Sequence, residues 1–406
     1  MNISTDSAAI DEILTRSIAQ IYPSPAAFKA ALSSGSRLTF YVGIDPTADY
    51  VHLGHATNYL ILERLHALGH RIIVLVGDFT AMIGDPSDKT SMRVQLTREQ
   101  VEQNLQTFKD QIGQILDFES TENPIEFKFN SEWLSALDFQ QCVELASNFT
   151  VQQMLERDAF QKRVAQQKPL FVHEFFYPLM QGYDSVAMDV DAEIGGTDQT
   201  FNMLAGRTLL KRYKDKEKFV IATTLLENPE TGEKLMSKSL GTGVGLNEPP
   251  KRMFAGVMRL PDAGIIQTFI DCTRVTMAEI ESLKSRMAAG ENPRDIKMIL
   301  GYEVTKMYHG EAEAQAAREA WVAEVSNKET AADLPEVSVN PTTDLLDTIV
   351  YLGIVDSKSK ARRLFDEGAV RVGTTKLTLD GYQSEILDGA VLSVGKKHQF
   401  IIRTTA

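Results

Sequence analysis

Residues 41–55 read YVGIDPTADYVHLGH, and this stretch joins a buried strand to a helix. The strand is the apolar run at 38–44, which leads into an Asp-Pro turn signal. The helix is predicted over 56–68, where apolar residues recur at helical spacing until Gly69. A second apolar run at 71–76 is typical of a strand buried on both faces of a parallel sheet. This order of strand, helix and strand predicts an α/β fold with a Rossmann-like, doubly wound parallel sheet.

The rest of the chain divides by composition and spacing. Residues 219–226 predict a further strand, and the stretch from about 90 to 190 is longer than a simple crossover needs, which predicts an insertion. Helical spacing prevails after Pro249, and prolines among small polar residues then indicate a linker. We therefore expect four parts: residues 1–246 with the insertion at about 90–190, an α-helical domain at 247–330, a linker at 331–342, and a small α+β module at 343–406.

The composition is that of a globular protein, because 43% of the 406 residues are hydrophobic and 24% are charged. This excludes a mainly disordered chain and a fibre. The two cysteines, Cys142 and Cys272, cannot form a disulfide framework, so we expect a reducing, cytoplasmic environment. The polar start of the chain does not resemble a secretory signal, and the apolar run at 72–76 is too short to cross a bilayer. The net charge of −13 argues against a general binder of polyanions.

Two histidines, His52 and His55, lie at the predicted amino end of the first helix. Ligands of α/β sheets bind beyond the carboxyl ends of the strands, and the amino ends of helices favour anions. The two imidazoles could donate hydrogen bonds to phosphate oxygens there, and Gly54 would let a backbone or a nucleotide approach closely. The alternative is that each histidine is an ordinary core or surface residue. A metal site is not indicated, because the sequence nearby supplies no third ligand.

A second candidate segment, KLMSKS at 234–239, is followed by LGTGVG at 240–245. Two lysines among small hydroxyl residues and glycines are typical of a loop that attracts phosphates, and the alternative is a solvated surface loop. The spacing of glycine and lysine excludes a Walker loop.

Together the two segments resemble the signatures of the class I aminoacyl-tRNA synthetases. HLGH at 52–55 resembles the His-Ile-Gly-His signature, and MSKS at 236–239 resembles the end of the Lys-Met-Ser-Lys-Ser signature. Leu235 stands before the methionine, so the first lysine of that signature is either displaced to Lys234 or absent. Within this class the chain resembles the tyrosyl-tRNA synthetases over nearly its whole length. The segments that carry this resemblance are 41–49, 76–86, 177–184 and 194–199.

This resemblance implies a tyrosine pocket. It places Tyr41 and Asp184 at the phenol of the substrate, and Tyr177, Gln181 and Asp85 around its ammonium group. Helical spacing would put Tyr177, Gln181 and Asp184 on one face, with Tyr177 as a cap or in the first turn. Three further members of the pocket are implied, namely Thr80, Asn130 and Gln199.

The resemblance also implies an ATP site, with Mg²⁺ accompanying the nucleotide and no dedicated metal cage in the protein. The catalytic residues at the phosphates would be Thr47, His52, His55, Lys234 and Lys238. The wider nucleotide site would comprise Gly43, Asp45, His52, Gly54, His55, Gly196, Asp198, Met236, Ser237 and Lys238. Asp198 would accept hydrogen bonds from the ribose hydroxyls, whereas Val42 cannot offer a side-chain hydrogen bond.

The implied activity is that of a tyrosine–tRNA ligase, which forms tyrosyl-adenylate and pyrophosphate and then transfers tyrosine to the 3′ end of its tRNA. The terminal module resembles an RNA-binding domain of ribosomal proteins. It would grip tRNA through Lys358, Lys360, Arg362, Arg363 and Arg371. A homodimer without membrane contact is expected from the family. A tryptophan–tRNA ligase, a non-catalytic RNA-binding relative and a generic nucleotidyltransferase stay open as alternatives.

Overall fold

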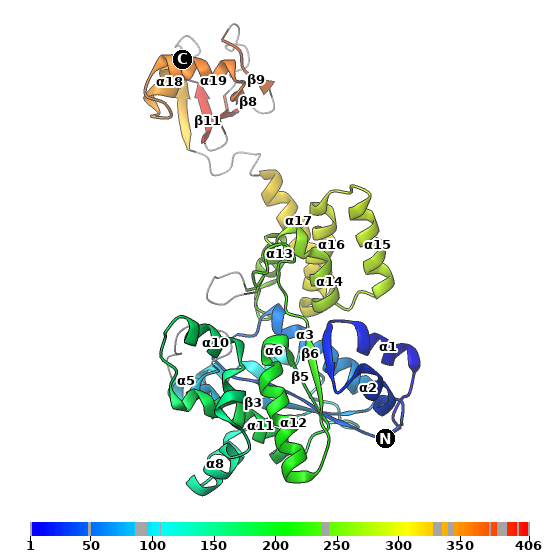
Figure 1. The fold of residues 1–406 in the computed structure, drawn as a ribbon. Helices are drawn as coiled ribbons and strands as arrows, with labels where there is room; N and C mark the ends of the chain where they lie inside the picture. The colour runs from blue at the N-terminus through cyan, green and yellow to red at the C-terminus, as the bar shows by residue number, and fades with distance from the viewer. Residues whose placement is uncertain are drawn as a thin grey trace. The chain divides into compact units, whose positions relative to one another are not determined.

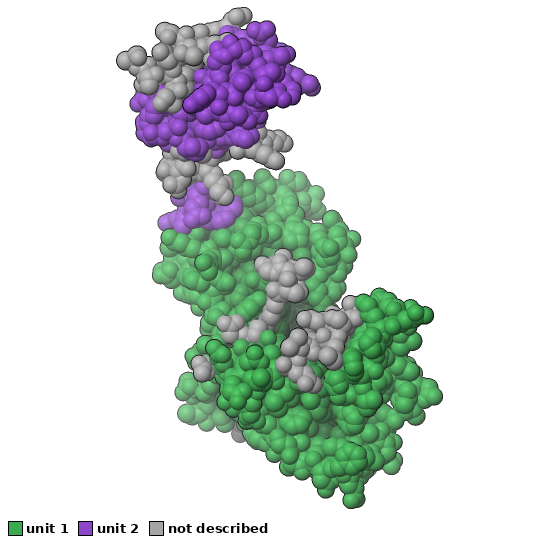
Figure 2. Space-filling model, turned by 90° about the vertical axis from the view of Figure 1, so that its left-hand side faces the viewer, with its two compact units in different colours: residues 1–318 green, residues 319–406 purple. Residues whose placement is uncertain are grey.

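The computed structural model describes residues 2–47, 50–85, 96–105, 107–236, 243–327, 335–339, 345–372, 375–379, 388–395 and 398–404. The chain divides into two compact units, Met1–Arg318 and Glu319–Ala406, which are coloured separately in Figure 2. Each unit has its own sheet and its own hydrophobic core (Figure 1). Within the described residues, no helix combines the length and the apolar character needed to cross a membrane.

The first unit is built on a six-stranded sheet in the order β1-β6-β5-β2-β3-β4. Its strands are β1 (Ile18–Tyr22), β2 (Thr39–Ile44), β3 (Arg71–Val76), β4 (Glu126–Phe129), β5 (Ala192–Gly196) and β6 (Phe219–Thr223). Strands β2 to β6 are parallel to one another, whereas β1 pairs antiparallel with β6 at one edge. The predicted parallel sheet is confirmed for these five strands. The antiparallel edge strand was not predicted, because only one residue of IAQIY is buried and the segment forms no apolar run.

The helices of the first unit lie before, between and after these strands, and the last of them continues past Arg318 into the second unit. They are α1 (Ser7–Thr15), α2 (Pro25–Leu32), α3 (Leu53–Ala67), α4 (Thr80–Ile83), α5 (Arg98–Leu105), α6 (Phe108–Ile112), α7 (Ser131–Leu134), α8 (Phe139–Ala146), α9 (Val151–Leu155), α10 (Asp158–Ala165), α11 (Phe176–Met188), α12 (Thr200–Lys214), α13 (Pro250–Met258), α14 (Ile265–Cys272), α15 (Met277–Ala288), α16 (Pro293–His309) and α17 (Glu311–Asn327). Short 3-10 turns lie at η1 (Val172–Phe175), η2 (Thr197–Gln199) and η3 (Asp262–Gly264). The helix predicted over 56–68 is α3, which begins earlier because His52 already occupies the N-cap position.

The connection between β3 and α11 holds the short helices α4 to α10, where the sequence predicts an insertion at about 90–190. One element of this stretch belongs to the central sheet instead, because β4 pairs in parallel with β3. The residues of β4 are all half-buried, so they lack the apolar run that identified its neighbour.

The core that positions the site is formed by β2, β3 and α3. Residues 40–42 of β2 and 72–76 of β3 are buried, which explains their uninterrupted apolar sequence. The same hydrophobic core continues into α14 and α16 through Phe269 and Leu300. The core is therefore continuous across the boundary between residues 246 and 247, and the division there stays a prediction.

Helices α11 and α12 lie side by side and approach each other closely at two glycines (Figure 1). A Cβ on Gly182 would lie 2.8 Å from Leu209 Cδ1 and 3.1 Å from the backbone nitrogen of Gly206. A Cβ on Gly206 would lie 2.4 Å from Lys218 Nζ and 2.8 Å from Ser185 Oγ. Glycine costs about 1 kcal/mol relative to alanine in a helix interior. Glycine is therefore required at both positions, because neighbouring atoms occupy the space that a Cβ would need.

The second unit has a five-stranded sheet in the order β7-β11-β10-β8-β9. Its elements are β7 (Glu336–Val339), α18 (Leu345–Tyr351), α19 (Lys358–Asp366), β8 (Val370–Val372), β9 (Thr375–Lys376), β10 (Val391–Val394) and β11 (His398–Thr404). Strand β7 pairs in parallel with β11, so residues 336–339 belong to this sheet and not to a linker over 331–342. Four residues reading EVSV, with two apolar side chains, form too short a pattern to identify a strand.

Candidate active site

The candidate site lies beyond the carboxyl ends of the parallel strands. Asp45 follows β2, Thr80 follows β3, Asn130 follows β4, and Asp198 follows β5. Because parallel strands end at the same edge of a sheet, these side chains are brought together although they are far apart in the sequence. This is the edge at which the sequence predicts a ligand.

His52 and His55 stack on each other at the start of α3. Their ring centroids are 3.8 Å apart with 19° between the ring planes, and the His52 backbone N–H donates to His55 Nδ1 at 3.3 Å. The neutral His55 ring therefore carries its proton on Nε2. This places an imidazole N–H at a helix amino end, where the helix dipole favours an anion.

Backbone pairing joins the HLGH segment to the residues that follow the second signature segment. Residues 51–53 pair with residues 244–246 through N–H···O=C hydrogen bonds of 2.9 and 2.8 Å. Met236 packs at this junction, because a Cβ on Gly54 would lie 3.3 Å from its Cβ. Packing against Met236 therefore explains the glycine at position 54, in addition to its predicted role at the nucleotide. Ser237 and Lys238 lie outside the described residues.

Lys234 Nζ lies 3.3 Å from Asp198 Oδ2. The lysine predicted to contact the ATP phosphates is therefore next to the aspartate predicted to bind the ribose. A Cβ on Gly196 would lie 2.7 Å from Asp198 Oδ1, which explains the glycine there. A Cβ on Gly43 would meet no heavy atom within 4 Å, so its surroundings are open to a ligand. Thr47 is half-exposed, and its backbone N–H donates to the carbonyl two residues earlier at 2.8 Å.

Several residues predicted for the tyrosine pocket are joined by a first run of hydrogen bonds. Asp45 accepts from the Tyr177 hydroxyl and from Thr80 Oγ1, each at 2.7 Å. Asn130 Nδ2 donates to Thr80 Oγ1 at 3.0 Å and to Asp184 Oδ2 at 3.3 Å. Asp45, which the sequence assigns to ATP, is therefore bonded directly to two residues assigned to tyrosine.

A second run of hydrogen bonds leads from α11 through Asn202 to Asp85. Asn202 Nδ2 donates to Gln181 Oε1 at 2.9 Å and to Gln199 Oε1 at 3.0 Å. Gln199 Nε2 and an Arg157 nitrogen each donate to Asp85 at 2.7 Å. Three predicted residues are brought together in this way, and Asn202 and Arg157 are members that the sequence did not indicate.

Asp184 is a buried acceptor. Its two carboxylate oxygens accept hydrogen bonds from Trp133 Nε1 at 2.7 Å and from Asn130 Nδ2 at 3.3 Å. Burial raises the pKa of Asp184 well above its ordinary value, and the two N–H donors oppose this rise because they favour the carboxylate. A carboxylate has about four lone-pair positions, so two donors leave acceptor capacity for a substrate hydroxyl.

Tyr41 in β2 is fully buried, and its hydroxyl lies 2.8 Å from Ser185 Oγ. Burial raises the pKa of Tyr41 most, and the charges of Glu193 and Asp184 raise it further. The Tyr41 phenol therefore stays protonated and can donate a hydrogen bond close to the Asp184 carboxylate.

Comparison with known proteins identifies the family of this chain. Residues 33–326 match the family described as class I tRNA synthetases (W and Y). The chain is 42% identical over 368 residues to tyrosine–tRNA ligase 2 of Clostridium acetobutylicum, covering 90% of each chain. It is also 42% identical over 378 residues to the tyrosine–tRNA ligase of Carboxydothermus hydrogenoformans, again covering 90% of each. The chain belongs to the tyrosyl-tRNA synthetase family.

A solved structure shows the same fold. The C-terminally truncated mitochondrial tyrosyl-tRNA synthetase of Aspergillus nidulans superposes with a TM-score of 0.65 at 20% identity, covering 78% of this chain and 94% of that one. At this identity the likeness concerns the fold alone. The Rossmann-like sheet is therefore shared with a tyrosyl-tRNA synthetase, as the sequence predicts.

Several residues of this synthetase site were not predicted from the sequence, namely Trp133, Arg157, Ser185, Glu193, Asn202 and Lys218. Ser185 adjoins Asp184 in the chain, so its place beside a predicted residue could have suggested it. Lys218 stands directly before the buried strand β6, and a charge at that place is the one local signal that it gives. The others are defined only by contacts between distant segments.

The basic residues that the family resemblance assigns to RNA lie in the second unit, on α19 and β8. Lys358, Lys360, Arg362, Arg363 and Arg371 are all exposed. Three of them also form ion pairs, namely Lys358 with Asp347 at 2.6 Å, Lys360 with Asp356 at 2.7 Å and Arg363 with Glu367 at 2.7 Å. Exposed ion pairs contribute about 0–1 kcal/mol, so phosphates can replace these carboxylates.

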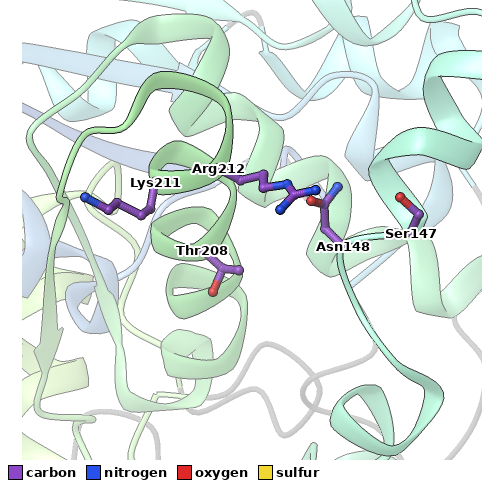
Figure 3. Close-up of a pocket in the computed structure, with 5 residues that line it drawn as sticks. All are labelled: Ser147, Asn148, Thr208, Lys211 and Arg212. Carbon is purple, nitrogen blue, oxygen red and sulfur yellow. The ribbon is translucent and has the colours of Figure 1, made fainter.

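A separate hollow of about 480 Å³ lies between the end of α8 and α12 (Figure 3). Its lining residues are Ser147, Asn148, Thr208, Lys211 and Arg212. No residue assigned to tyrosine or ATP lines it, so this hollow is not the pocket for either substrate of the synthetase.

Proposed function

We propose that this chain is a tyrosine–tRNA ligase whose tyrosine pocket is formed by residues of β2, α11 and the segment after α4, and whose ATP site lies at the starts of α3 and η2. The relatives support ATP-dependent ligation of tyrosine to tRNA over ligation of tryptophan and over a non-catalytic role. One observation carries the pocket: the buried Asp184 carboxylate, held by two N–H donors, directly precedes Ser185, whose Oγ lies 2.8 Å from the buried Tyr41 hydroxyl.

Tyr41 and Asp184 recognise the substrate phenol. Asp184 accepts the phenol O–H, and Tyr41 donates to the phenol oxygen. Phenylalanine would leave both groups without a partner, and an unpaired buried polar group costs about 1–3 kcal/mol. Tryptophan carries its N–H donor at a different place on its ring, so it cannot satisfy the same pair.

The ammonium group of the substrate needs acceptors at the mouth of the pocket. The Tyr177 hydroxyl, Gln181 Oε1 and the Asp85 carboxylate provide them. Arg157 and Gln199 hold the Asp85 carboxylate, and Asp45 holds the Tyr177 hydroxyl. Thr80 in turn donates to Asp45, and Asn130 donates to Thr80.

Activation begins when the tyrosine carboxylate attacks the α-phosphorus of ATP and pyrophosphate leaves. The carboxylate is already a nucleophile, so the step needs positioning and neutralisation of charge on the pyrophosphate, and no protein base. The residues that contact these phosphates are Thr47, His52, His55, Lys234 and Lys238. A ribose hydroxyl at the 3′ end of tRNA then attacks the acyl carbon, and AMP leaves.

The protein holds the nucleotide at its ribose and through close contacts with the protein backbone. Asp198 accepts hydrogen bonds from the ribose hydroxyls, and Gly43 and Gly196 allow close approach. Asp45, Gly54, Met236 and Ser237 complete this site. Mg²⁺ would accompany ATP, held by its phosphates and water, and would help to neutralise the charge on the pyrophosphate.

A second copy of the chain covers the apolar surface of the short helices between β4 and α11. Five apolar side chains of this stretch are more than half exposed, namely Phe139 at 84%, Val143 at 54%, Val151 at 66%, Val164 at 56% and Val172 at 75%. Phe139 and Val143 are four residues apart on α8 and so share one face. An exposed apolar pair on one helix face is a feature that a subunit interface would cover. The dimer binds tRNA in the cytoplasm, with the second unit contacting phosphates.

The experiment that tests this function is amino-acid-dependent ATP–pyrophosphate exchange without tRNA, with each of the twenty amino acids tested separately. Exchange with tyrosine alone is the expected result. Exchange with tryptophan would retain the fold and contradict the assignment of Tyr41 and Asp184. Folded protein that binds tRNA and supports no exchange would be a non-catalytic relative.

A further inference from the structure

A buried ion pair lies behind the proposed tyrosine pocket. Lys218 and Glu193 are 0% and 2% exposed, and the Lys218 ammonium contacts the Glu193 carboxylate directly. Burying two charges is costly unless further hydrogen bonds satisfy both groups. Both groups have such bonds here: Lys218 Nζ donates to Ser185 Oγ at 2.7 Å, and Glu193 Oε1 accepts from Gln181 Nε2 at 2.9 Å.

These bonds connect the two ends of the pocket. At one end, Ser185 Oγ lies 2.8 Å from the Tyr41 hydroxyl, and Lys218 Nζ lies 5.7 Å from the centroid of the Tyr41 ring. At the other end, Glu193 holds Gln181, which the pocket uses at the substrate ammonium. One buried ion pair is therefore bonded to a residue at the phenol and to a residue at the ammonium.

The charges also fix the direction of each hydrogen bond. An ammonium group only donates, so Ser185 Oγ must accept from Lys218 and keeps one lone pair and its own proton for Tyr41. A carboxylate only accepts, so Gln181 must turn its NH₂ group toward Glu193. The Gln181 carbonyl then faces the opposite side, where it accepts from Asn202 at 2.9 Å and can accept from an ammonium group.

The backbone of α12 leaves room for this arrangement. A Cβ on Gly206 would lie 2.4 Å from Lys218 Nζ and 2.8 Å from Ser185 Oγ, so no other residue fits there without displacing one of them. The glycine that weakens the interior of α12 is thus explained by the ion pair and its serine partner.

We propose that Lys218, together with Glu193, is a positioning residue for tyrosine recognition, which acts through Ser185 on Tyr41 and through Gln181 on the substrate ammonium. The inference rests on the proposed tyrosine pocket and extends it to residues that do not touch the substrate. A substitution in this set should therefore weaken tyrosine binding and leave ATP binding unchanged.

The test measures ATP–pyrophosphate exchange with the full chain. Ser185→Ala retains the ion pair and removes its link to Tyr41. The double substitution Lys218→Met with Glu193→Gln removes both charges and leaves no buried charge unpaired. For each we expect the KM for tyrosine to rise about tenfold, as for the loss of one buried hydrogen bond. The ratio of kcat/KM for tyrosine over phenylalanine should fall, while the KM for ATP stays within about twofold.

Lys216→Met is the matched control. It removes the same charge two residues earlier in the chain, where Lys216 pairs with Asp189 at 3.4 Å and Asp191 at 2.9 Å, away from Tyr41. Its kinetic constants should equal those of the unaltered chain. Thermal unfolding of each variant establishes that the assays compare folded proteins.

Two results would overturn the inference. If folded Ser185→Ala keeps the tyrosine KM and the discrimination against phenylalanine while Tyr41→Phe loses that discrimination, the pocket is right and the ion pair does not position it. If Tyr41→Phe also keeps full discrimination, the pocket itself is wrong and the role of Lys218 is overturned with it.

Discussion

Replacing Asp184 by asparagine is the sharpest test of the tyrosine pocket, because the surrounding hydrogen bonds leave the new amide no satisfactory orientation. Trp133 Nε1 and Asn130 Nδ2 each donate to one of the two Asp184 oxygens. Asn130 cannot turn its own amide around, since its Oδ1 already accepts from the Phe79 backbone N–H at 3.0 Å. The asparagine at position 184 must therefore direct its NH₂ group at another N–H donor.

The magnitude follows from what is lost. The substrate phenol loses a charged acceptor, and a hydrogen bond to a charged group contributes about 1.5–3 kcal/mol. At 1.4 kcal/mol per factor of ten, tyrosine recognition should weaken by roughly 10- to 150-fold. Phenylalanine makes no such bond, so its weak activity should change little and the discrimination ratio should fall by a similar factor.

The assay is pyrophosphate exchange at varied tyrosine and phenylalanine concentrations, with Asp189→Asn as control. Asp189 is the exposed C-cap of the same helix and pairs with the surface Lys216. The tyrosine KM of the unaltered chain should also rise as the pH falls through the raised pKa of Asp184, since a protonated carboxyl is an uncharged and weaker acceptor, and the Asp184→Asn variant should lack this dependence. A tyrosine KM and a discrimination ratio within about twofold of the unaltered chain would refute the assignment.

Four further predictions can be tested independently. Lys238→Ala should slow tyrosyl-adenylate formation in single-turnover assays and leave tyrosine affinity unchanged, and an equal loss of tyrosine binding would contradict its phosphate role. Deleting residues 335–406, a cut placed before β7 because that strand belongs to the second sheet, should preserve pyrophosphate exchange and reduce tRNA charging, whereas equal loss of both would indicate a structural role. Phe139→Ser should shift the chain toward monomer in sedimentation experiments, and an unchanged mass would place the interface elsewhere. Burial lowers the pKa of His70 from 6.5 to about 4, so between these pH values the unfolded chain binds more protons than the folded chain. The free energy of unfolding should therefore fall by about 1–3 kcal/mol as the pH drops from 6.5 to about 4. In urea titrations His70→Gln should show a shallower fall, and an identical fall would exclude His70 as the cause.

The parts of this molecule that the sequence predicts are those with a local physical cause. Strands β2 and β3 and helix α3 were predictable because buried runs and helical periodicity are visible within a few residues. Asp45 could be placed at the ligand edge because it directly follows a buried strand. Edge strands such as β1 and β7 were missed because half-exposed strands need no apolar run.

The partners of the site residues could not be predicted, because they depend on contacts between distant segments. Nothing local to Trp133 indicates that its N–H reaches a carboxylate 51 positions further along the chain. The Lys218 ammonium likewise reaches Ser185 33 positions earlier, through space that a glycine in α12 leaves open. A family signature names the residues at the substrate, whereas the residues that hold them in place become visible only in the folded structure.

The helix α11 explains how one element can select tyrosine by both length and chemistry. Tyr177, Gln181 and Asp184 lie four and three residues apart on this helix and so share a face. At a rise of about 1.5 Å per residue, the ammonium and phenol ends of the pocket are separated by roughly 10 Å of rigid helix. This spacing accepts phenylalanine as readily as tyrosine, because the two differ only by the terminal hydroxyl. With the proposed pocket, length would exclude other side chains, and rejection of phenylalanine would depend on Asp184 and Tyr41. The groups that orient these two residues should therefore matter as much as those that touch the substrate.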